Sequence, residues 1–465
     1  MSIFTSLITS TIGESRGVAR LWLEGQKLLR AGVKIGSNYT LRENVSKRRL
    51  ELNPTVGAAP GFVVSKRERN GVVTPLLEIR SEILRKVFAT ARKVRVVIRL
   101  GCIVVTAIEN DARTQERLDR WTTKIVKGEP LAVCSLFHGG GVLDRAIHNG
   151  LLRAGVGSFV QVGVELESQY LDASLRNNPM LWTEQSIAIC SDIRDIRRGL
   201  DIPKCEIVVA GIPCTGASRA GKAKNKLLAT EEHQSAGALF VDFLDFVRYA
   251  NPAVAIIENV PDYLTSTSMM VIRSVLGGLG YKLFECVLRG AEFGALENRE
   301  RMTVVAYTNG AMTDLVREDI EPVRVKEASL GAVLEDIPHD DKLWKPYAYL
   351  VDKAIRDKAV GKGFARQLIN ADSVSCGCIG RGYAKARSTE PFIQHPVDSS
   401  LSRLLTKEEH ARVKTIPEEI VAGVSDTIAH EILGQSVIFS AFEALAQAIG
   451  RMIWRALDNR GCIAA

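Results

Sequence analysis

The stretch EIVVAGIPCTGASRAGKAKNK, from Glu206 to Lys226, decides what kind of fold this chain adopts. It begins with a continuous apolar run, which is typical of a strand buried on both faces of a parallel sheet. The run ends in Gly-Ile-Pro-Cys, so a proline fixes the backbone just ahead of Cys214. The small and basic residues that follow suit a loop that closes over phosphate groups. We therefore predict a nucleophilic thiol at the end of a buried strand.

The sequence on both sides of this stretch repeats the same arrangement of apolar runs and helical segments. The predicted strands are LAVCSLF (131–137), FVQVGVE (159–165), SIAICSDI (186–193), CEIVVAGIPC (205–214), PAVAIIENV (252–260), YKLFECVL (281–288) and RMTVVAY (301–307). Such alternation predicts an α/β fold in which helices cover both faces of a mostly parallel sheet. Most of these strands end near a glycine, a carboxylate or a cysteine, so we expect function along the carboxyl edge of the sheet.

The first three strand ends suggest a nucleotide-like ligand. SLFHGGG places three glycines between a strand and a helix, where backbone N–H groups can approach a ligand closely. Glu165 and Asp192 end the next two strands, where carboxylates can bind a ribose diol and an adenine amine. Each feature alone is also explained by a turn or a helix cap. Together they predict a site for an adenosine-containing cofactor.

The later strand ends supply groups for acid catalysis. IIENVPD places Glu258 on the same edge, where a carboxyl beside a nucleophile can act as a general acid. LENRERMTVV places Arg299 and Arg301 just before a strand. Their spacing of two residues predicts that both lie on one face, where guanidinium groups can hold a carbonyl oxygen and orient the glutamate.

These motifs, in this order, resemble those of the DNA cytosine-5 methyltransferases. SLFHGGG is similar to the cofactor-binding first motif, GIPCTGASRAG to the Pro-Cys motif, ENV to the glutamate motif and FGALENRERMTV to the Gln-x-Arg-x-Arg motif. RLLTKEEHARVKTIP and GQSVIFSAFEALAQAIG are similar to the last two motifs, and the match spans Leu131 to Leu457. The resemblance implies a Rossmann-like class I methyltransferase sheet and a small, irregular target-recognition domain.

The resemblance also implies a mechanism. Double-stranded DNA is the implied partner, and a cytosine is flipped out of the duplex. Cys214 attacks C6 of that base, Glu258 in its protonated form supports N3, Arg301 lies near O2 and Arg299 braces the site. The C5 atom then takes a methyl group, and loss of the C5 proton releases Cys214.

The implied cofactor is S-adenosyl-L-methionine. By resemblance, Phe137 stacks on the adenine, Glu165 binds the ribose and Asp192 accepts from the adenine amine. The residues expected to line the remainder of the cofactor site are Gly139, Gly140, Gly141, Ile193, Pro213, Gln435, Ser436 and Val437. No metal is expected, because the close pair Cys376 and Cys378 has no further ligands at the spacing of a zinc site.

Four residues depart from the family pattern. Glu297 stands where the family has glutamine and adds a negative charge near the arginines. Gln435 replaces an asparagine, Val142 stands where glycine is common, and His138 stands where a small residue is common. These departures bear on cofactor affinity, but none removes a reacting group.

The N-terminal part has its own character. Residues 1–128 contain 24 Lys and Arg against 11 Asp and Glu, a net charge of +13, whereas the rest of the chain has a net charge of −5. This imbalance predicts contact with a polyanion. When the segment is superposed on itself at an offset of 55 residues, Leu28 falls on Ile83 and Leu41 on Val96. This match indicates a duplicated strand–helix–strand–strand unit. RLWLEGQKLLRAGVKIGSNYTL resembles the swapped-hairpin barrels of bacterial antitoxins and transition-state regulators.

We expect four segments in all. These are a basic β-rich domain with a linker helix (1–128), a catalytic domain (129–308), a target-recognition region (309–400) and a return to the catalytic domain (401–465). The alternatives are a tRNA cytosine-5 methyltransferase, or a non-catalytic DNA-binding regulator on a methylase scaffold. The N-terminal domain can also be a dimerisation module.

Composition completes these expectations. The nine cysteines are scattered, which favours reduced thiols, and no apolar run is long enough for a membrane span. We expect a cytoplasmic, nucleoid-associated protein. The target sequence, the host and the presence of a cognate restriction enzyme are not predicted by any of these features.

Overall fold

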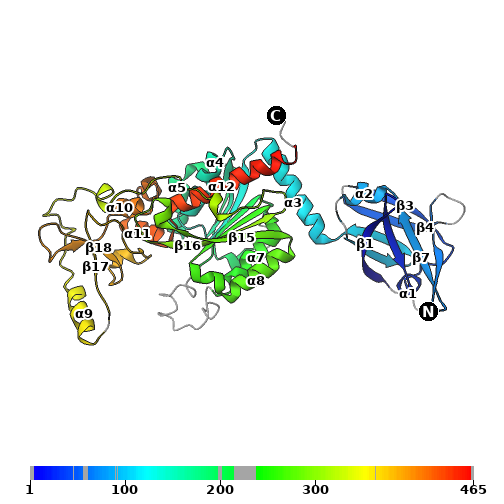
Figure 1. Ribbon diagram of the computed structural model, residues 1–465, viewed down its shortest axis with the longest axis horizontal. Helices are drawn as coiled ribbons and strands as arrows, with labels where there is room; N and C mark the ends of the chain where they lie inside the picture. Colours follow the sequence, from blue (N-terminus) through cyan, green and yellow to red (C-terminus); the bar gives the residue numbers. More distant parts are fainter. Residues whose placement is uncertain are drawn as a thin grey trace. The chain divides into compact units, whose positions relative to one another are not determined.

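The computed structural model describes residues 5–461, except 46, 56–60, 90, 92, 197–201, 214–236 and 362. Cys214 and the basic segment behind it lie outside the described residues. The chain divides into two compact units, Met1–Glu116 and Arg117–Ala465 (Figure 1). Each unit is described by itself.

The first unit is a single antiparallel sheet with two short helices. Its strands are β1 (Ser6–Ser15), β2 (Val18–Glu24), β3 (Asn38–Asn44), β4 (Arg49–Thr55), β5 (Phe62–Val63), β6 (Ser65–Arg69), β7 (Val72–Arg80), β8 (Lys93–Arg99) and β9 (Cys102–Ala107), and its helices are α1 (Gln26–Arg30) and α2 (Ile83–Phe88). The strand order is β5-β3-β4-β9-β8-β1-β2-β7-β6. One apolar cluster fills its interior, so the unit has a core of its own.

The predicted internal repeat is present in this unit. β2, α1, β3 and β4 recur as β7, α2, β8 and β9, and β3 falls on β8 at the predicted offset. The hairpin of one repeat pairs with that of the other through β4 and β9. The helices are displaced by one residue from the predicted offset, because Leu84 is the fully buried counterpart of Leu28, whereas Ile83 is only partly buried.

The second unit is built on a seven-stranded sheet. Its strands are β10 (Leu131–Leu136), β11 (Ser158–Glu165), β12 (Ile187–Cys190), β13 (Ile207–Gly211), β14 (Val254–Asn259), β15 (Tyr281–Arg289) and β16 (Glu300–Thr308). The order is β12-β11-β10-β13-β14-β16-β15. Six of the strands run in one direction, and β16 runs in the opposite direction between β14 and β15. All seven predicted strands are present. The strand order reverses between β10 and β13, and ligands bind at such a switch point in open α/β sheets.

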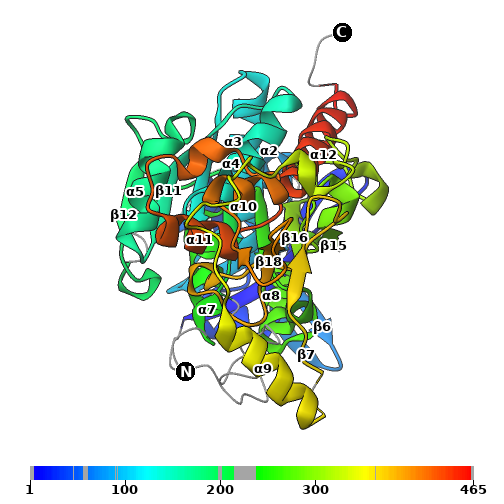
Figure 2. The ribbon, with the colours of Figure 1, turned by 90° about the vertical axis from the view of Figure 1, so that its left-hand side faces the viewer.

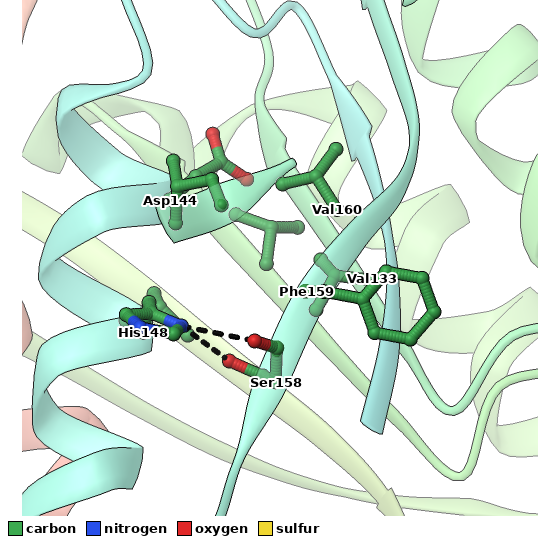
Figure 3. A pocket seen from close by; sticks show the side chains of 9 residues that line it. Val133, Asp144, His148, Ser158, Phe159 and Val160 are labelled. Carbon is green, nitrogen blue, oxygen red and sulfur yellow. Dashed lines mark hydrogen bonds between the residues drawn. The ribbon is translucent and has the colours of Figure 1, made fainter. Parts of the chain in front are cut away.

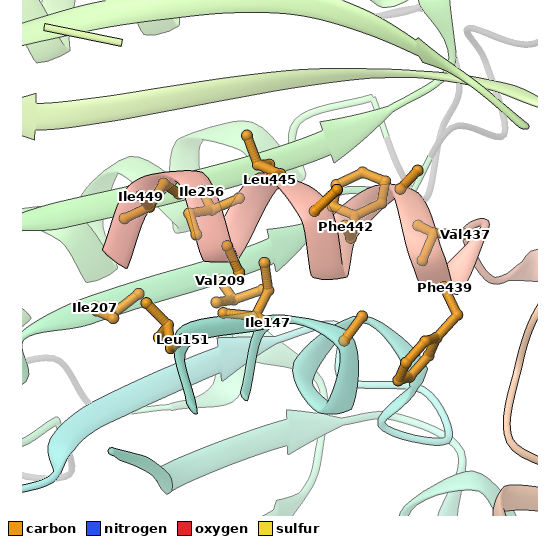
Figure 4. Packing of buried hydrophobic residues seen from close by; sticks show 14 of the residues in the cluster. Ile147, Leu151, Ile207, Val209, Ile256, Val437, Phe439, Phe442, Leu445 and Ile449 are labelled. Atoms are coloured by element: carbon orange, nitrogen blue, oxygen red, sulfur yellow. The ribbon is translucent and has the colours of Figure 1, made fainter. Parts of the chain in front are cut away.

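Helices cover both faces of this sheet, as a two-sided apolar strand requires. Ile207 and Val209 face one core, which contains residues of α4 (Val142–Arg153), α5 (Ser168–Asn177) and α12 (Phe439–Asp458). The intervening Val208 and Ala210 face a second core, formed with α7 (Leu239–Ala250) and α8 (Thr267–Gly278). Figure 4 shows α12 beside α4, with Ile207, Val209 and Ile256 of the sheet packed against the two helices. The predicted α/β fold is therefore confirmed.

The helix α3 (Glu109–Val126) begins in the first unit and ends in the second. Its last turns are part of the second unit's core, since Trp121 is buried and donates its indole N–H to the Ala311 carbonyl at 2.9 Å. The buried Arg117 donates to Thr308 at 2.6 Å. The boundary between the units therefore lies earlier in this helix than the predicted end of the N-terminal segment at residue 128.

The region predicted to recognise the target has little regular structure. It contains α9 (Ala348–Ala359) and a small sheet of β17 (Gln367–Ile369), β18 (Pro391–Gln394) and β19 (Ser402–Arg403). Figure 2 shows α9 and β18. A separate apolar cluster around Ile379 and Tyr383 supports it. The helices α10 (Lys407–Val413) and α11 (Asp426–Gln435) then lead back to α12.

In the part of the chain that the structure describes, no single helix is long and apolar enough to cross a membrane. The bent pair of α11 and α12 has the length and composition of a membrane span. Both helices, however, contribute buried residues to the core of the second unit.

Candidate active site

The predicted site residues meet at one edge of the seven-stranded sheet. The parallel strands β10 to β14 all end there, and the antiparallel β16 begins there. Residues that follow the ends of different strands therefore come together.

The glycine-rich turn after β10 is bound to the end of β11. The Gly139 N–H donates to the Glu165 carboxylate at 2.6 Å, and the other oxygen of that carboxylate accepts from the N–H groups of Leu166 and Glu167. Gly139 has φ +59°, and a Cβ there would meet only the Gln435 amide at 4.0 Å. The space in front of this glycine is open, so a ligand can approach its backbone.

The next glycines are tightly packed instead. Gly141 has φ +77°, and a Cβ there would lie 2.5 Å from the Ser174 hydroxyl. A Cβ on Gly140 would lie 2.5 Å from the side chain of Ile432 in α11. Phe137, which opens the turn, also has a left-handed backbone (φ 59°). Together these residues form a narrow, preshaped turn at the switch point.

Two departures from the family pattern have structural roles in this turn. His138 is buried, and its ring nitrogens lie 3.0 Å from the Asp144 carboxylate and 2.7 Å from the Ser174 hydroxyl. It thereby links the turn to α4 and α5. Val142 begins α4 and is buried in the core. The larger side chains at both positions point into the protein and leave the open side of the turn free.

Asp192 lies at the end of β12 beside a residue that sequence reasoning missed. The Arg194 guanidinium donates to the Asp192 carboxylate, with 2.8 Å between Arg194 Nε and Asp192 Oδ1. The hydrogen bonds from Arg194 lower the pKa of Asp192 to about 2. Asp192 is therefore an anion held in one orientation. The neighbouring Ile193 is buried in the second core, and the Ser191 N–H donates to the Glu165 carbonyl at 3.0 Å.

The approach to Cys214 is fixed by the neighbouring strand. Gly211 pairs with Glu258, and a Cβ on Gly211 would lie 3.4 Å from the Glu258 carboxylate. Asn259 donates its side-chain amide to the Ile212 carbonyl at 3.1 Å. Pro213 follows and is the last described residue before the cysteine. Asn259 was not predicted, although it stands within the ENV motif.

Glu258 is buried and paired with Arg301. The Glu258 Oε1 lies 2.8 Å from the Arg301 Nε, and both side chains are nearly excluded from solvent. Burial raises the pKa of the Glu258 carboxyl above its ordinary value, and the charges of Arg301, Arg299 and Lys414 limit that rise. A carboxyl in such a setting can hold a proton and give it to a bound base.

Arg299 directly precedes β16, and Arg301 lies within it. The charges of both act on the Glu258 carboxyl. The Arg299 guanidinium donates to the carbonyls of Ile379 at 3.1 Å and Gly434 at 2.9 Å, and it lies 3.3 Å from the Glu297 carboxylate. Arg299 therefore joins β16 to the recognition region and to the end of α11.

The charge of Glu297 is compensated by a second buried cation. The Lys414 ammonium lies 3.5 Å from Glu297 Oε2, and both side chains are fully buried. Lys414 donates one hydrogen bond to the Leu433 carbonyl. Its contact with Glu297 is an ion pair without a hydrogen bond, since no described group donates to Glu297 Oε2. Burial, followed by repulsion from Arg299, lowers the pKa of Lys414 to about 7. The sequence offered no signal for this pairing.

The last predicted motif reaches the glycine turn. Gln435 ends α11 and is exposed toward Gly139, the Ser436 hydroxyl donates to the Leu433 carbonyl at 2.7 Å, and Val437 is buried. The same segment lies against the recognition region, since a Cβ on Gly434 would lie 2.3 Å from the Gly380 carbonyl.

Two further features lie near these residues. Cys376 is buried, whereas Cys378 is exposed and accepts a hydrogen bond from Arg299 at 3.1 Å. A cavity of about 10 Å³ lies between α4 and the sheet, where the His148 Nδ1 lies 3.0 Å from the Ser158 carbonyl (Figure 3). A space of this size is no larger than one water molecule requires, so the cavity is no substrate site.

Comparisons with known proteins agree with this arrangement. A model of the C-5 cytosine-specific DNA methylase family matches residues 133–451. The Type II methyltransferase M.NlaX of Neisseria lactamica is 30% identical over 267 residues, which are 56% of this chain and 80% of that protein. The Type II methyltransferase M1.ScrFI of Lactococcus lactis subsp. cremoris is 28% identical over 255 residues, 53% of this chain and 62% of that protein. The solved structure of the S. pombe Dnmt2 methyltransferase matches with a TM-score of 0.54 and 20% identity over 71% of this chain and 99% of that chain, which shows the fold.

Proposed function

Because the chain belongs to the C-5 cytosine-specific DNA methylases, and is thus an enzyme of that class, we propose that it methylates carbon 5 of a cytosine in double-stranded DNA. The proposal rests above all on the buried Glu258–Arg301 pair, 2.8 Å apart, beside the strand that leads to Cys214. Such a pair can bind the polar edge of a flipped cytosine.

In the proposed reaction, the Cys214 thiolate adds to C6 of the cytosine. Protonated Glu258 donates to N3 and Arg301 to O2, so the electrons displaced from the C5–C6 double bond are stabilised on the ring and C5 becomes nucleophilic. C5 forms its new bond to the methyl carbon as the bond from that carbon to its donor sulfur breaks. The C5 proton then leaves to a base, N3 returns its proton to Glu258, the C5–C6 double bond re-forms and Cys214 departs as the thiolate. Arg299 positions the reacting side chains, because its guanidinium holds the backbone carbonyls of Ile379 and Gly434.

S-adenosylmethionine is the proposed cofactor and supplies an electrophilic methyl group when bound. The residues fit it in two respects. The open backbone of Gly139 lies beside the Glu165 carboxylate, which can accept from ribose hydroxyls, and the anionic Asp192 can accept from an adenine amine. We assign Phe137, Gly140, Gly141, Ile193, Pro213, Gln435, Ser436 and Val437 to the lining of the same site.

The remaining assignments follow from the family and from charge. We propose that residues 309–400 recognise the target sequence and that residues 401–465 return to the catalytic domain. The relatives compared above are named as Type II methyltransferases, and we propose that this enzyme likewise has a cognate restriction endonuclease. DNA is its proposed substrate, so we place it in the cytoplasm with the nucleoid.

The decisive experiment is methyl sequencing of DNA from cells that express the wild type or Cys214→Ser. We expect 5-methylcytosine in one sequence context with the wild type and none with the variant. Methylation confined to the cells' tRNA would replace DNA by RNA as the substrate. Absence of 5-methylcytosine from both nucleic acids would leave a DNA-binding scaffold as the alternative.

A further inference from the structure

The first unit presents one strongly basic surface. β3, β4, β9, β8 and β1 are neighbours in its sheet, and their inward side chains are buried, as for Val94, Val96 and Ile98 of β8. The alternate residues therefore point outward. We call this outer surface the β8 face. Its outward basic residues are Arg42, Arg49, Lys93, Arg95 and Arg99, and the one acidic residue at the outward positions described is Glu51.

The register of the strands places hydroxyl groups beside these charges. Arg95 lies opposite Thr106 on β9 and opposite Thr9 on β1, and Thr106 lies opposite Arg49 on β4. Paired residues on one face of a sheet have Cβ atoms about 4.5–5.5 Å apart. Guanidinium and hydroxyl donors at this spacing are the groups that contact phosphate and sugar oxygens in nucleic-acid complexes.

One charge of the β8 face is compensated within the unit, since the Arg49 Nε lies 2.7 Å from the Glu51 carboxylate. On the other strands, basic residues form ion pairs, as Arg20 does with Glu78 at 2.9 Å and Arg67 with Glu24 at 2.8 Å. Among the residues that the structure describes, no acidic side chain forms an ion pair with Lys93, Arg95 or Arg99. Their charges therefore remain available to an external anion.

We propose that the β8 face binds the phosphate backbone of double-stranded DNA and so increases the affinity of the enzyme for its DNA substrate. This inference rests on the proposed function, the methylation of DNA. From Lys93 to Arg99 the face extends roughly 20 Å along the strand, the length of about six base pairs. A second copy of the chain is the less suitable occupant, because a two-fold contact through this face would place like charges opposite one another.

The test compares two triple variants of the full chain. Lys93→Gln/Arg95→Gln/Arg99→Gln neutralises the β8 face. The matched control, Arg20→Gln/Arg67→Gln/Arg69→Gln, removes the same net charge from residues that are ion-paired to Glu78 and Glu24. Affinity for a fluorescent duplex of about 30 base pairs is measured by anisotropy, without cofactor, between about 50 and 200 mM salt.

We expect the β8-face variant to bind DNA more weakly. The slope of the logarithm of its binding constant against the logarithm of the salt concentration should be shallower by about 0.9 for each phosphate that the variant no longer neutralises. The control should keep the slope of the wild type. An equal decrease of affinity in both triple variants would overturn the proposal, and so would an unchanged slope accompanied by a changed oligomeric state in sedimentation. If the triple variant fails to fold, Arg95→Gln against Arg95→Lys gives the same comparison, because lysine keeps the charge.

This outcome is separable from that of the proposed function. A wild type that binds DNA through the β8 face but transfers no methyl group would contradict the reaction and leave the face intact. A wild type that methylates DNA while the β8-face variant keeps the wild-type salt slope would contradict the face and leave the reaction intact.

Discussion

Burial acts in opposite directions on the protons of Glu258 and Lys414. Both side chains are almost excluded from water, which raises the pKa of the carboxyl and lowers that of the ammonium. Each group is thereby moved toward its neutral form near neutral pH. The site thus contains one group suited to donate a proton and one cation that is easily neutralised.

The role of Glu258 is tested by Glu258→Gln, which keeps the shape and removes the ionisable proton. We expect methyl transfer to fall by about 10²- to 10⁴-fold with little change in the free energy of unfolding. The measurement is the rate of radiolabelled methyl incorporation into DNA. Glu285→Gln is the matched control. Glu285 lies on β15, the next strand but one from β14, and is likewise paired with an arginine, Arg273 of α8. A Glu258→Gln enzyme as active as that control would contradict the assignment.

Lys414 gives a pH dependence of stability with a definite sign. The pKa of Lys414 is lowered from 10.5 to about 7 in the folded chain, so between these values the unfolded chain holds a proton that the folded chain has released. The free energy of unfolding should therefore rise with pH across this window and be lowest below it. The charged groups that act on Lys414 include Glu297, Arg299 and Arg301, and the Cys378 thiol lies near it as well.

The measurement is denaturant unfolding of the wild type and Lys414→Met at several pH values between 6 and 10. We expect the difference in favour of the wild type to increase with pH by on the order of a few kcal/mol, since one pKa unit corresponds to about 1.4 kcal/mol. A difference that is constant over this range would show that the ammonium keeps its proton in the folded state.

Among the elements, the glycine turn after β10 is sensitive to substitution. Gly141→Ala requires a left-handed backbone and a Cβ 2.5 Å from the Ser174 hydroxyl, so we expect weaker S-adenosylmethionine binding, by at least tenfold, in calorimetric titration. A left-handed backbone alone costs an L-residue about 1–2 kcal/mol. Gly277→Ala in α8 is the control, because a Cβ there meets nothing within 4 Å. Equal affinity in both variants would contradict a cofactor site at this turn.

The elements were largely predictable and their cross-contacts were not. Apolar runs identified all seven strands of the second unit, because the central strands are buried on both faces and the edge strands β12 and β15 keep an apolar sequence although they are more exposed. Side-chain partners distant in sequence left no such pattern. Asn259 beside Ile212 and Lys414 beside Glu297 follow only from the packed fold.

For the whole molecule, the two units should fold separately if the boundary is placed correctly. Each has its own core, and a domain with its own core can fold alone. We expect fragment 117–465 to unfold cooperatively. Fragment 127–465 should be destabilised by several kcal/mol, because it lacks the buried Trp121 and Arg117; the loss of a large buried aromatic side chain costs about 3–5 kcal/mol. Thermal unfolding of both fragments provides the measurement, and equal stability would contradict the proposed role of α3.

The close contact of Gly434 with Gly380 has a consequence for protein engineering. Target specificity in modular enzymes can be altered by transplanting the segment that reads the substrate. Here the junction of that segment with the scaffold includes a glycine-to-glycine contact and the backbone of Ile379, to which Arg299 donates. A chimaera should therefore take its donor sequence from inside residues 309–375 and retain the host's own 376–380. The backbone of Gly380 has to keep its place against Gly434, and a side chain at position 380 would itself meet the Glu390 carboxylate, 3.2 Å from its Cβ.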